Sequence, residues 1–291
     1  GPAGNLRVLD WAGFRGAMTY TFDDGNQSQI ANYDAMNALG VRFTFYLVSS
    51  WAGATSPVWP RALADGHEIG NHTASHLGEG STLAEDTDAG EEFIEDTFGS
   101  VAYTMAAPFG AAPYVEIAST RYLLNRGAAD GLIAPTDQTD QFNLNCFLPP
   151  ADAPQNLLDA KVNAARSAGS WQIQLIHGFS NGSDGAFQPV DFDTFAASVE
   201  HAKSLGDVWI DSVINVGSYW IAQRMFNALT PESSGTEATW TWTLPAHFPS
   251  GKYLRVVVDG GTPTQAGAPL TWDEHGYYEV ALDQGSLTLA P

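Results

Sequence analysis

The sequence has little of what several protein classes require. Cys146 is the only cysteine, so no disulfide can form within the chain and a disulfide-stabilised scaffold is excluded. Lys and Arg number 12 against 33 Asp and Glu, which gives a formal net charge of −21. Nucleic acids and anionic membranes attract basic surfaces, so this charge argues against both as partners. No apolar run approaches the roughly 20 residues that a membrane-spanning helix needs.

The composition is typical of a folded protein. Hydrophobic residues make up 44% and aromatic residues 12% of the 291 positions, which excludes intrinsic disorder. The length suits one large domain, or a domain of ordinary size with a small appendage. Strong acidity is common in secreted proteins, so we expect a secreted or periplasmic location. The alternative is a cytoplasmic protein whose acidity serves solubility. Residues 1–4 resemble the remnant of a cleaved tag and are left out of the fold prediction.

Two regions with different patterns divide the chain. Residues 5–229 alternate short apolar runs with helical spacing, which predicts an α/β domain. Its predicted strands are 17–22, 42–48, 102–106, 122–125, 171–176 and 208–210, and its predicted helices are 28–39, 57–64, 82–98, 154–167, 193–204 and 212–226. Residues 230–291 are β-rich with Gly, Pro and Asp between the runs, and they predict a small all-β domain with strands at 237–244, 253–258, 277–282 and 286–289.

Two adjacent carboxylates, Asp23 and Asp24, follow the predicted strand 17–22. Neighbouring side chains at a strand end point in different directions, so one carboxylate could bind a metal while the other handles a proton. The alternative is an ordinary turn, since Asp-Asp-Gly is favourable turn chemistry in any protein.

Two histidines four residues apart, His72 and His76, form a second candidate. This spacing can place both imidazoles on one side of a helical turn, which suits a divalent metal such as zinc. The alternative is a pair of surface histidines in a loop.

Two further segments could contribute to a site. His177 ends the predicted strand 171–176, where α/β folds present catalytic groups, although a hydrogen-bonded core histidine is the commoner case. Ala106 to Gly110 read as a strand followed by a Pro turn. The backbone N–H groups of this turn could face a ligand, or the turn could only reverse the chain.

The order and spacing of these elements resemble one known family, the polysaccharide deacetylases, which are the NodB-homology family of carbohydrate esterases. The motifs that carry the resemblance are residues 21–25 (TFDDG), 72–76 (HTASH), 108–110 (PFG) and 173–177 (IQLIH). They lie within a region of similarity of about residues 15–225, which does not include the β-rich tail. The resemblance implies a distorted (β/α) barrel with fewer strands than the regular eight, and a site at the carboxyl ends of the strands.

The same resemblance implies a role for each motif residue. A divalent metal, most often zinc but also cobalt or nickel, would be held by three ligands: Asp24, His72 and His76. Asp23 would accept a proton as water attacks the acetyl carbonyl. The backbone N–H of Phe109 would stabilise the oxyanion, and His177 would protonate the leaving group.

The sequence departs from the family pattern at two places. Ala106 stands where the family usually has an arginine that pairs with the catalytic aspartate; Arg126 is our first candidate for a replacement and Arg121 the second. The nearest match to the Asp-x-x-Asp-Trp motif, residues 137–140, lacks the Trp. The partner of His177 is therefore not assigned from the sequence.

The resemblance predicts a metal-dependent hydrolase that removes acetyl groups from an acetylated carbohydrate. The substrate could be a glycan that contains N-acetylglucosamine or an O-acetylated polysaccharide such as acetylxylan. Aromatic rings suit the apolar faces of sugars, and Trp51, Trp59 and Trp209 are the candidates for substrate contact. Two alternatives are a family member that binds carbohydrate without catalysis, and a binding or adhesion role located in the β-rich tail. The oligomeric state is not predicted.

Overall fold

The computed structural model describes residues 5–291, so the predicted tag remnant at residues 1–4 lies outside the described residues. The chain forms two compact units. One, the parallel-sheet unit, comprises residues 15–216. The other, the antiparallel unit, comprises residues 217–291 together with the described residues up to Phe14. The units thus differ in extent from the predicted regions 5–229 and 230–291, because the N-terminal strand belongs with the C-terminal sheets. The assignment of two domains stays a prediction.

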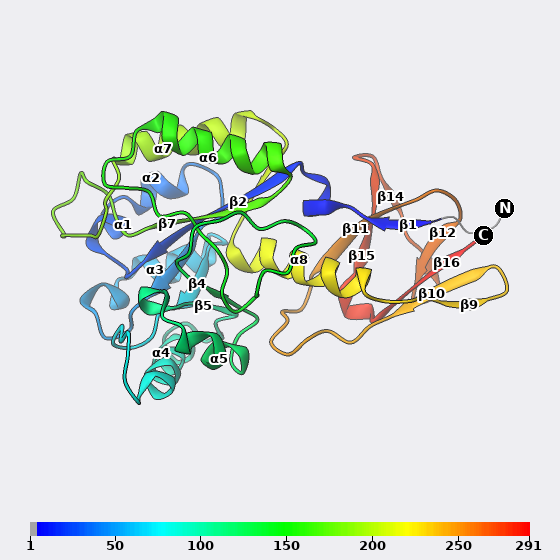
Figure 1. Cartoon of the computed structure of the whole chain (residues 1–291), viewed down its shortest axis with the longest axis horizontal. Coiled ribbons are helices and arrows are strands. Elements are labelled where there is room, and N and C mark those ends of the chain that lie inside the picture. The colour runs from blue at the N-terminus through cyan, green and yellow to red at the C-terminus, as the bar shows by residue number, and fades with distance from the viewer. Residues whose placement is uncertain (1–4) are drawn as a thin grey trace. The chain divides into compact units, whose positions relative to one another are not determined.

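Seven parallel strands form the sheet of the first unit: β2 (Gly16–Asp23), β3 (Thr44–Leu47), β4 (Glu68–Asn71), β5 (Thr104–Ala106), β6 (Leu124–Arg126), β7 (Trp171–Ile176) and β8 (Val208–Ile210). Their order is β6-β5-β4-β3-β2-β7, and β8 also pairs with β2. The strands curl into a half-barrel (Figure 1). This confirms the predicted distorted barrel with fewer than eight strands.

Helices cover the outside of the half-barrel: α1 (Gln27–Ala31), α2 (Tyr33–Asn37), α3 (Val58–Ala64), α4 (Leu83–Phe98), α5 (Pro113–Ser119), α6 (Gln155–Ala168) and α7 (Phe192–Ser204). The predicted helix 28–39 is broken into α1 and α2 at Asn32. The side chain of Asn32 donates a hydrogen bond to the carbonyl of Ser28, and such side-chain bonds compete with helix continuation. The sequence patterns did not predict α5 or β4.

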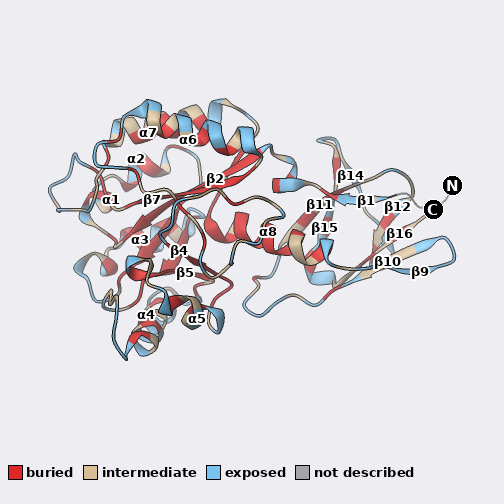
Figure 2. Cartoon of the chain, in the orientation of Figure 1, coloured by how far each residue is buried: buried red, intermediate tan, exposed pale blue. Residues whose placement is uncertain are grey.

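The core of this unit lies between β2 and the helices α6 and α7. Met18, Tyr20 and Phe22 of β2 pack outward into an apolar cluster, and the Phe22 ring lies 5.6 Å from that of Phe195 on α7. Figure 2 shows that the faces of α6 and α7 toward the sheet are buried, whereas their outer faces are exposed. Since side chains alternate along a strand, Thr21 and Asp23 point to the barrel interior.

The antiparallel unit consists of two sheets. One has the order β1 (Leu6–Val8), β11 (Tyr253–Val258), β15 (Tyr277–Ala281) and β14 (Trp272–Asp273). The other has the order β13 (Ala268–Pro269), β12 (Thr262–Gln265), β16 (Ser286–Ala290), β10 (Glu237–Thr241) and β9 (Glu232–Ser234). Alternate residues of the central strands are buried, including Leu254, Val256, Leu287 and Leu289, which is the pattern of two-layered sheets. The all-β prediction for the tail is confirmed.

The strand β1 explains why the N-terminus belongs to this unit. It pairs antiparallel with β11, and Leu6 lies opposite Val258. The division between the units falls inside α8 (Val213–Asn227). A pairing between strands about 250 positions apart leaves no local signal in the sequence.

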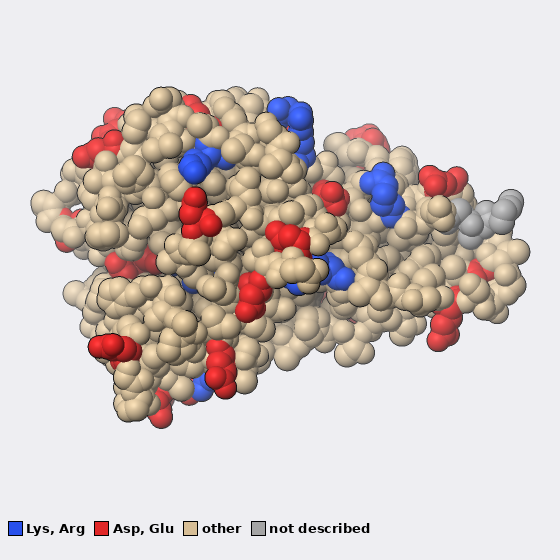
Figure 3. Space-filling model, viewed as in Figure 1, with Lys and Arg blue, Asp and Glu red and all other residues tan. Residues whose placement is uncertain are grey.

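The visible surface is acidic. Figure 3 shows Asp and Glu side chains scattered over it and few Lys and Arg side chains, in line with the net charge of −21. Among residues 5–291, no helix combines the length and the hydropathy that crossing a membrane requires.

Candidate active site at the carboxyl ends of the parallel strands

The candidate residues meet in one cavity of about 400 Å³. β2 ends at Asp23, and Asp24 follows with a φ of 79°. The loop after β4 supplies His72 and His76, and the residue after β7 is His177. The carboxyl ends of parallel strands lie at the same edge of a sheet, so these side chains converge although the sequence separates them widely.

The spacing of Asp24, His72 and His76 fits a divalent metal ion. One ligand atom from each lies within 4.8 Å of the others. Oδ1 of Asp24 lies 3.4 Å from Nε2 of His72 and 3.8 Å from Nε2 of His76. Tetrahedral ligands at about 2.1 Å from zinc lie about 3.4 Å apart, so little adjustment is needed. Oδ1 of Asp24 is buried and accepts no hydrogen bond within residues 5–291, as expected of a ligand atom.

Hydrogen bonds orient both histidines. Nδ1 of His72 lies 2.7 Å from the carbonyl oxygen of Ala106, so Nδ1–H donates and Nε2 keeps its lone pair for an ion. Thr73 and His76 have positive φ values of 69° and 56°, and the backbone N–H of His76 donates to Oγ1 of Thr73. The two histidines therefore converge through a strained loop rather than a helical turn, and such strain is concentrated at functional sites.

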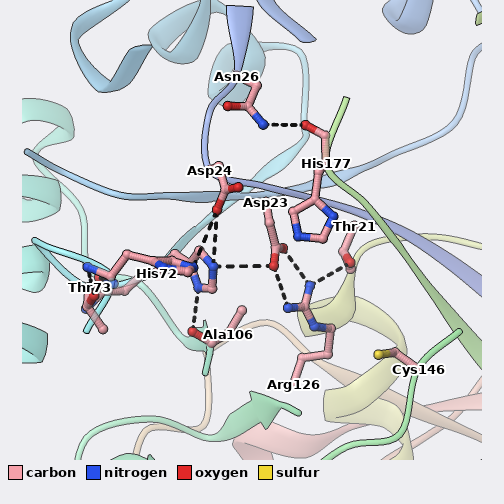
Figure 4. Close-up of polar contacts among 12 residues, drawn as sticks. Thr21, Asp23, Asp24, Asn26, His72, Thr73, Ala106, Arg126, Cys146 and His177 are labelled. Carbon is pink, nitrogen blue, oxygen red and sulfur yellow. Dashed lines mark hydrogen bonds and ion pairs between the residues drawn. The ribbon is translucent and has the colours of Figure 1, made fainter. Parts of the chain in front are cut away.

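Arg126 holds Asp23 through both carboxylate oxygens. Its Nη1 and Nη2 each donate to one oxygen at 2.6 Å, and Nη1 also donates to Oγ1 of Thr21 at 3.1 Å (Figure 4). Arg126 is 1% exposed. On the adjacent strands β5 and β6, Ala106 and Arg126 are register partners. The predicted pairing of Arg126 with Asp23 is confirmed: the guanidinium comes from the strand next to the one that usually carries it.

Arg121, the second candidate, has a different place. It pairs with Asp88 at 2.6 Å on the surface of the same unit. It therefore does not contact Asp23.

The charged groups of the site lower the pKa of Asp23 and raise the pKa of His72. Burial raises the pKa of Asp23, but Arg126 and His72 outweigh this and hold it well below its ordinary value. Burial lowers the pKa of His72, yet the carboxylates of Asp23 and Asp24 raise it above its ordinary value. Asp23 is therefore ionised at neutral pH.

Comparison with known proteins agrees with these motifs. Residues 15–123 match the family model "Polysaccharide deacetylase". The matched residues lie within the parallel-sheet unit, which is thus similar to the polysaccharide deacetylase family. A gellan lyase from Bacillus sp. is 30% identical to this chain over 148 residues, which are 48% of the chain. The chain spans about 6% of the length of that relative.

Two solved structures resemble this chain in fold. One is a candidate polysaccharide deacetylase from Mycobacterium smegmatis, with 16% identity, a TM-score of 0.57, and coverage of 77% of this chain and 96% of that chain. The other is a candidate polysaccharide deacetylase from Pseudomonas aeruginosa PAO1, with 11% identity, a TM-score of 0.58, and coverage of 74% and 94%. At this level of identity they show the shared fold alone.

His177 of the parallel-sheet unit is fixed through its backbone. Its carbonyl oxygen accepts hydrogen bonds from Nδ2 of Asn26 and Nε2 of Gln29, both at 2.8 Å. Burial lowers the pKa of its imidazole. Nδ1 is buried and forms no hydrogen bond within residues 5–291. Asp137 and Asp140 accept hydrogen bonds from backbone N–H groups of their own loop.

Two aromatic rings enclose His76. The ring of Trp51 lies 5.2 Å from the imidazole and that of Phe109 lies 4.6 Å from it. Phe109 has a positive φ of 58° and lines the cavity. The structure thus places Trp51 beside the site, as the substrate prediction requires.

The other two tryptophans proposed for substrate contact are buried and do not line the cavity. Trp59 is fully buried; its Nε1 donates to the carbonyl of Gly53, and its ring packs on Phe45. Trp209 is buried in β8, and its Nε1 donates to Asp211. Both rings are packing residues without a free face for a sugar. Phe187, which the sequence reasoning missed, does line the cavity.

Proposed function

We propose that the protein is a metal-dependent hydrolase that removes acetyl groups from an acetylated carbohydrate. The observation that carries this proposal is the division of labour between two adjacent carboxylates. Oδ1 of Asp24 lies 3.4 Å from Nε2 of His72 and 3.8 Å from Nε2 of His76. Both oxygens of Asp23 accept hydrogen bonds from Arg126, and Oδ2 of Asp23 also lies 3.4 Å from Nε2 of His72. The similarity of residues 15–123 to the polysaccharide deacetylase family supports the acetyl group as the target.

Asp24, His72 and His76 would hold zinc, cobalt or nickel. The bound ion would polarise the acetyl carbonyl and lower the pKa of a water molecule. His72 can serve as a ligand because the carbonyl of Ala106 takes its Nδ1 proton. The buried Oδ1 of Asp24 supplies the negative charge that two neutral imidazoles lack.

Asp23 would accept the proton as water attacks the carbonyl carbon. Arg126 fixes both of its oxygens, so the carboxylate is ionised and has one orientation. The backbone N–H of Phe109, in the turn that lines the cavity, would donate to the carbonyl oxygen as negative charge develops there.

His177 would complete the reaction by giving a proton to the leaving oxygen or nitrogen when the bond to the acetyl carbon breaks. One water is consumed, and acetate and a free hydroxyl or amine result. An amine leaves poorly without protonation, so His177 would matter more for N-acetyl than for O-acetyl substrates. Because an acetylated polymer lies outside the cell, we propose a secreted or periplasmic location.

Acetate release tests the proposal directly. Chitin oligosaccharides and acetylated xylan oligosaccharides would be assayed side by side, before chelation, after it, and after Zn²⁺ or Co²⁺ is restored. We expect release from one class, its loss on chelation, and its recovery with metal. Asp23→Asn should lose about 10²-fold or more of the rate while still binding Zn²⁺. If neither class yields acetate with metal restored, the proposal fails.

The alternative of a carbohydrate-binding protein without catalysis had one basis in the sequence, the missing arginine at Ala106. Arg126 supplies that guanidinium from the adjacent strand. No feature of the site now favours this alternative over the hydrolase.

A further inference from the structure

Exposed aromatic side chains gather at the cavity. Among the described residues of the parallel-sheet unit, four large apolar side chains are exposed: Trp51 (39%), Val101 (48%), Phe109 (73%) and Phe187 (58%). Phe109 and Phe187 line the cavity, and Trp51 packs beside His76. Single exposed apolar residues are ordinary, but three aromatic rings around one cavity indicate a binding surface.

The rings stand on two sides of the site. Trp51 and Phe109 flank His76, which belongs to the metal cluster. Phe187 flanks His177, with 5.5 Å between ring centroids and a nearly perpendicular arrangement. The edge of Phe187 or of His177 thus meets the face of the other, and more than half of the Phe187 side chain faces solvent.

The loop 178–190 that carries Phe187 is closed at its base. The backbone N–H of Ser180 donates to the carbonyl of Val190 at 2.8 Å, and the N–H of Val190 donates to the carbonyl of Gly178 at 3.1 Å. Two residues before Val190, Oε1 of Gln188 accepts a hydrogen bond from the N–H of Ala151 at 2.6 Å. These three hydrogen bonds hold the base of the loop.

Ser28, in α1, anchors the same loop. Its N–H donates to Oδ2 of Asp184 at 2.7 Å, and its Oγ accepts from the N–H of Phe179 at 2.9 Å. A Cβ at Gly178 would lie 2.6 Å from Oγ of Ser28, and a Cβ at Gly182 would lie 2.7 Å from its Cβ. The close approach at both positions requires glycine, so the loop that presents Phe187 is fitted to α1.

We propose that Phe187 is a sugar-binding residue of this site and stacks on the pyranose next to the acetylated sugar, on the His177 side. Aromatic faces pack on the apolar C–H faces of pyranoses. With Trp51 and Phe109 on the other side, the site then takes an oligosaccharide or polysaccharide chain rather than a single sugar. This inference rests on the proposed function, since it takes the cavity as the place of deacetylation.

Binding measured without turnover tests the inference. Calorimetric titrations of the full chain would use N-acetylglucosamine, its pentasaccharide and acetylated xylopentaose. We expect one pentasaccharide to bind and Phe187→Ala to weaken that binding about 3- to 10-fold. Phe187→Tyr should keep the affinity. Trp272→Ala is the matched control, because its ring is 51% exposed but lies outside the cavity lining, and it should bind as the wild type does.

Each outcome decides the inference. Selective weakening of pentasaccharide binding by Phe187→Ala, with Trp272→Ala binding as the wild type does, supports it. Equal affinity of Phe187→Ala and wild type overturns it, as does a wild type that binds neither pentasaccharide. An equal loss in Phe187→Tyr and Phe187→Ala would also contradict stacking. Failure of the proposed function is a separate result: binding without acetate release.

Discussion

Two sides of the cavity hold their functional groups in different ways. The strand side comprises Asp23, Asp24, His72 and Arg126. Both oxygens of Asp23 and Nδ1 of His72 have hydrogen-bond partners on other strands of the sheet. On the loop side, which comprises His177 and residues 178–190, Nδ1 of His177 has no hydrogen-bond partner within residues 5–291, and Phe187 faces solvent. Groups fixed by a sheet suit chemistry that cannot tolerate displacement. Groups on a loop suit recognition, which differs between substrates.

Removal of the Arg126 guanidinium should have the largest effect, because Arg126 lies at the centre of the strand side. Arg126→Ala leaves Asp23 buried without its partner, so we expect the free energy of unfolding to fall by about 3–5 kcal/mol. Acetate release should fall about 10³-fold, since the base loses its orientation. Urea denaturation and acetate assays measure the two effects.

Two variants sharpen this result. Arg121→Ala removes the exposed pair with Asp88 and should change stability by about 1 kcal/mol or less. Ala106→Arg in the Arg126→Ala background returns a guanidinium from the neighbouring strand and should recover part of the activity. Activity near the wild-type level in Arg126→Ala alone would show that Asp23 does not need its partner.

His177→Ala tests the chemistry of the loop side. We expect a loss of about 10²-fold on an N-acetylated oligosaccharide and a smaller loss on an O-acetylated one, because an alcohol needs less help to leave. Stability should change little compared with Arg126→Ala, since Nδ1 of His177 makes no hydrogen bond that the variant would break. Parallel kcat measurements on both substrates decide this; equal losses would argue against a general acid.

The pH dependence of the free energy of unfolding should show the contribution of the ion pair between Asp23 and Arg126. The folded-state pKa of Asp23 is lowered, so its pairing stabilises the fold above the ordinary carboxyl pKa of about 4 and is lost as the pH falls through the lowered value. The stability difference between wild type and Arg126→Ala should therefore be full at pH 7 and smaller at pH 3. Denaturation curves at both pH values measure it. If the stability difference between wild type and Arg126→Ala did not change with pH, the ion pair would not be its cause.

Gly182→Ala should have the smallest effect on activity, and this effect should be confined to the loop side. The new Cβ would meet Ser28, and the loop would shift at a cost of about 1–3 kcal/mol. We expect a few-fold higher KM for an oligosaccharide and an unchanged rate on 4-nitrophenyl acetate. Ser183→Ala, an exposed change in the same loop, is the control and should alter neither. A fall in Zn²⁺ affinity in Gly182→Ala would show that the two sides are coupled.

The strand side could be predicted from the sequence to a large extent. Asp23, Asp24, His72 and His76 lie in two short motifs directly after strands, so their neighbours in the chain specify their place. Arg126 was predictable only as a candidate, because which residue of β6 lies opposite Ala106 depends on the register between the strands. The register is set by packing across the sheet, so it cannot be predicted from the sequence of either strand alone.

The loop side and the substrate contacts were poorly predictable. Phe187 lies among Ser, Gly and Asp residues without periodicity, and only the cavity reveals its position. Trp59 and Trp209 were proposed for substrate contact but are buried, because the sequence around a tryptophan does not indicate whether its ring is buried. The pairing of β1 with β11 was missed for a related reason: contacts between distant segments depend on the whole fold.

The register of Ala106 and Arg126 has a consequence for how such sites are recognised. A search for sequence motifs would find alanine at position 106 in place of the expected arginine. It would therefore class this chain with inactive homologues. A search for a cation at a given point in space would find the group in place. Comparisons of such sites therefore need the positions of charged atoms, since the guanidinium on β6 reaches Asp23 although its register partner on β5 is an alanine.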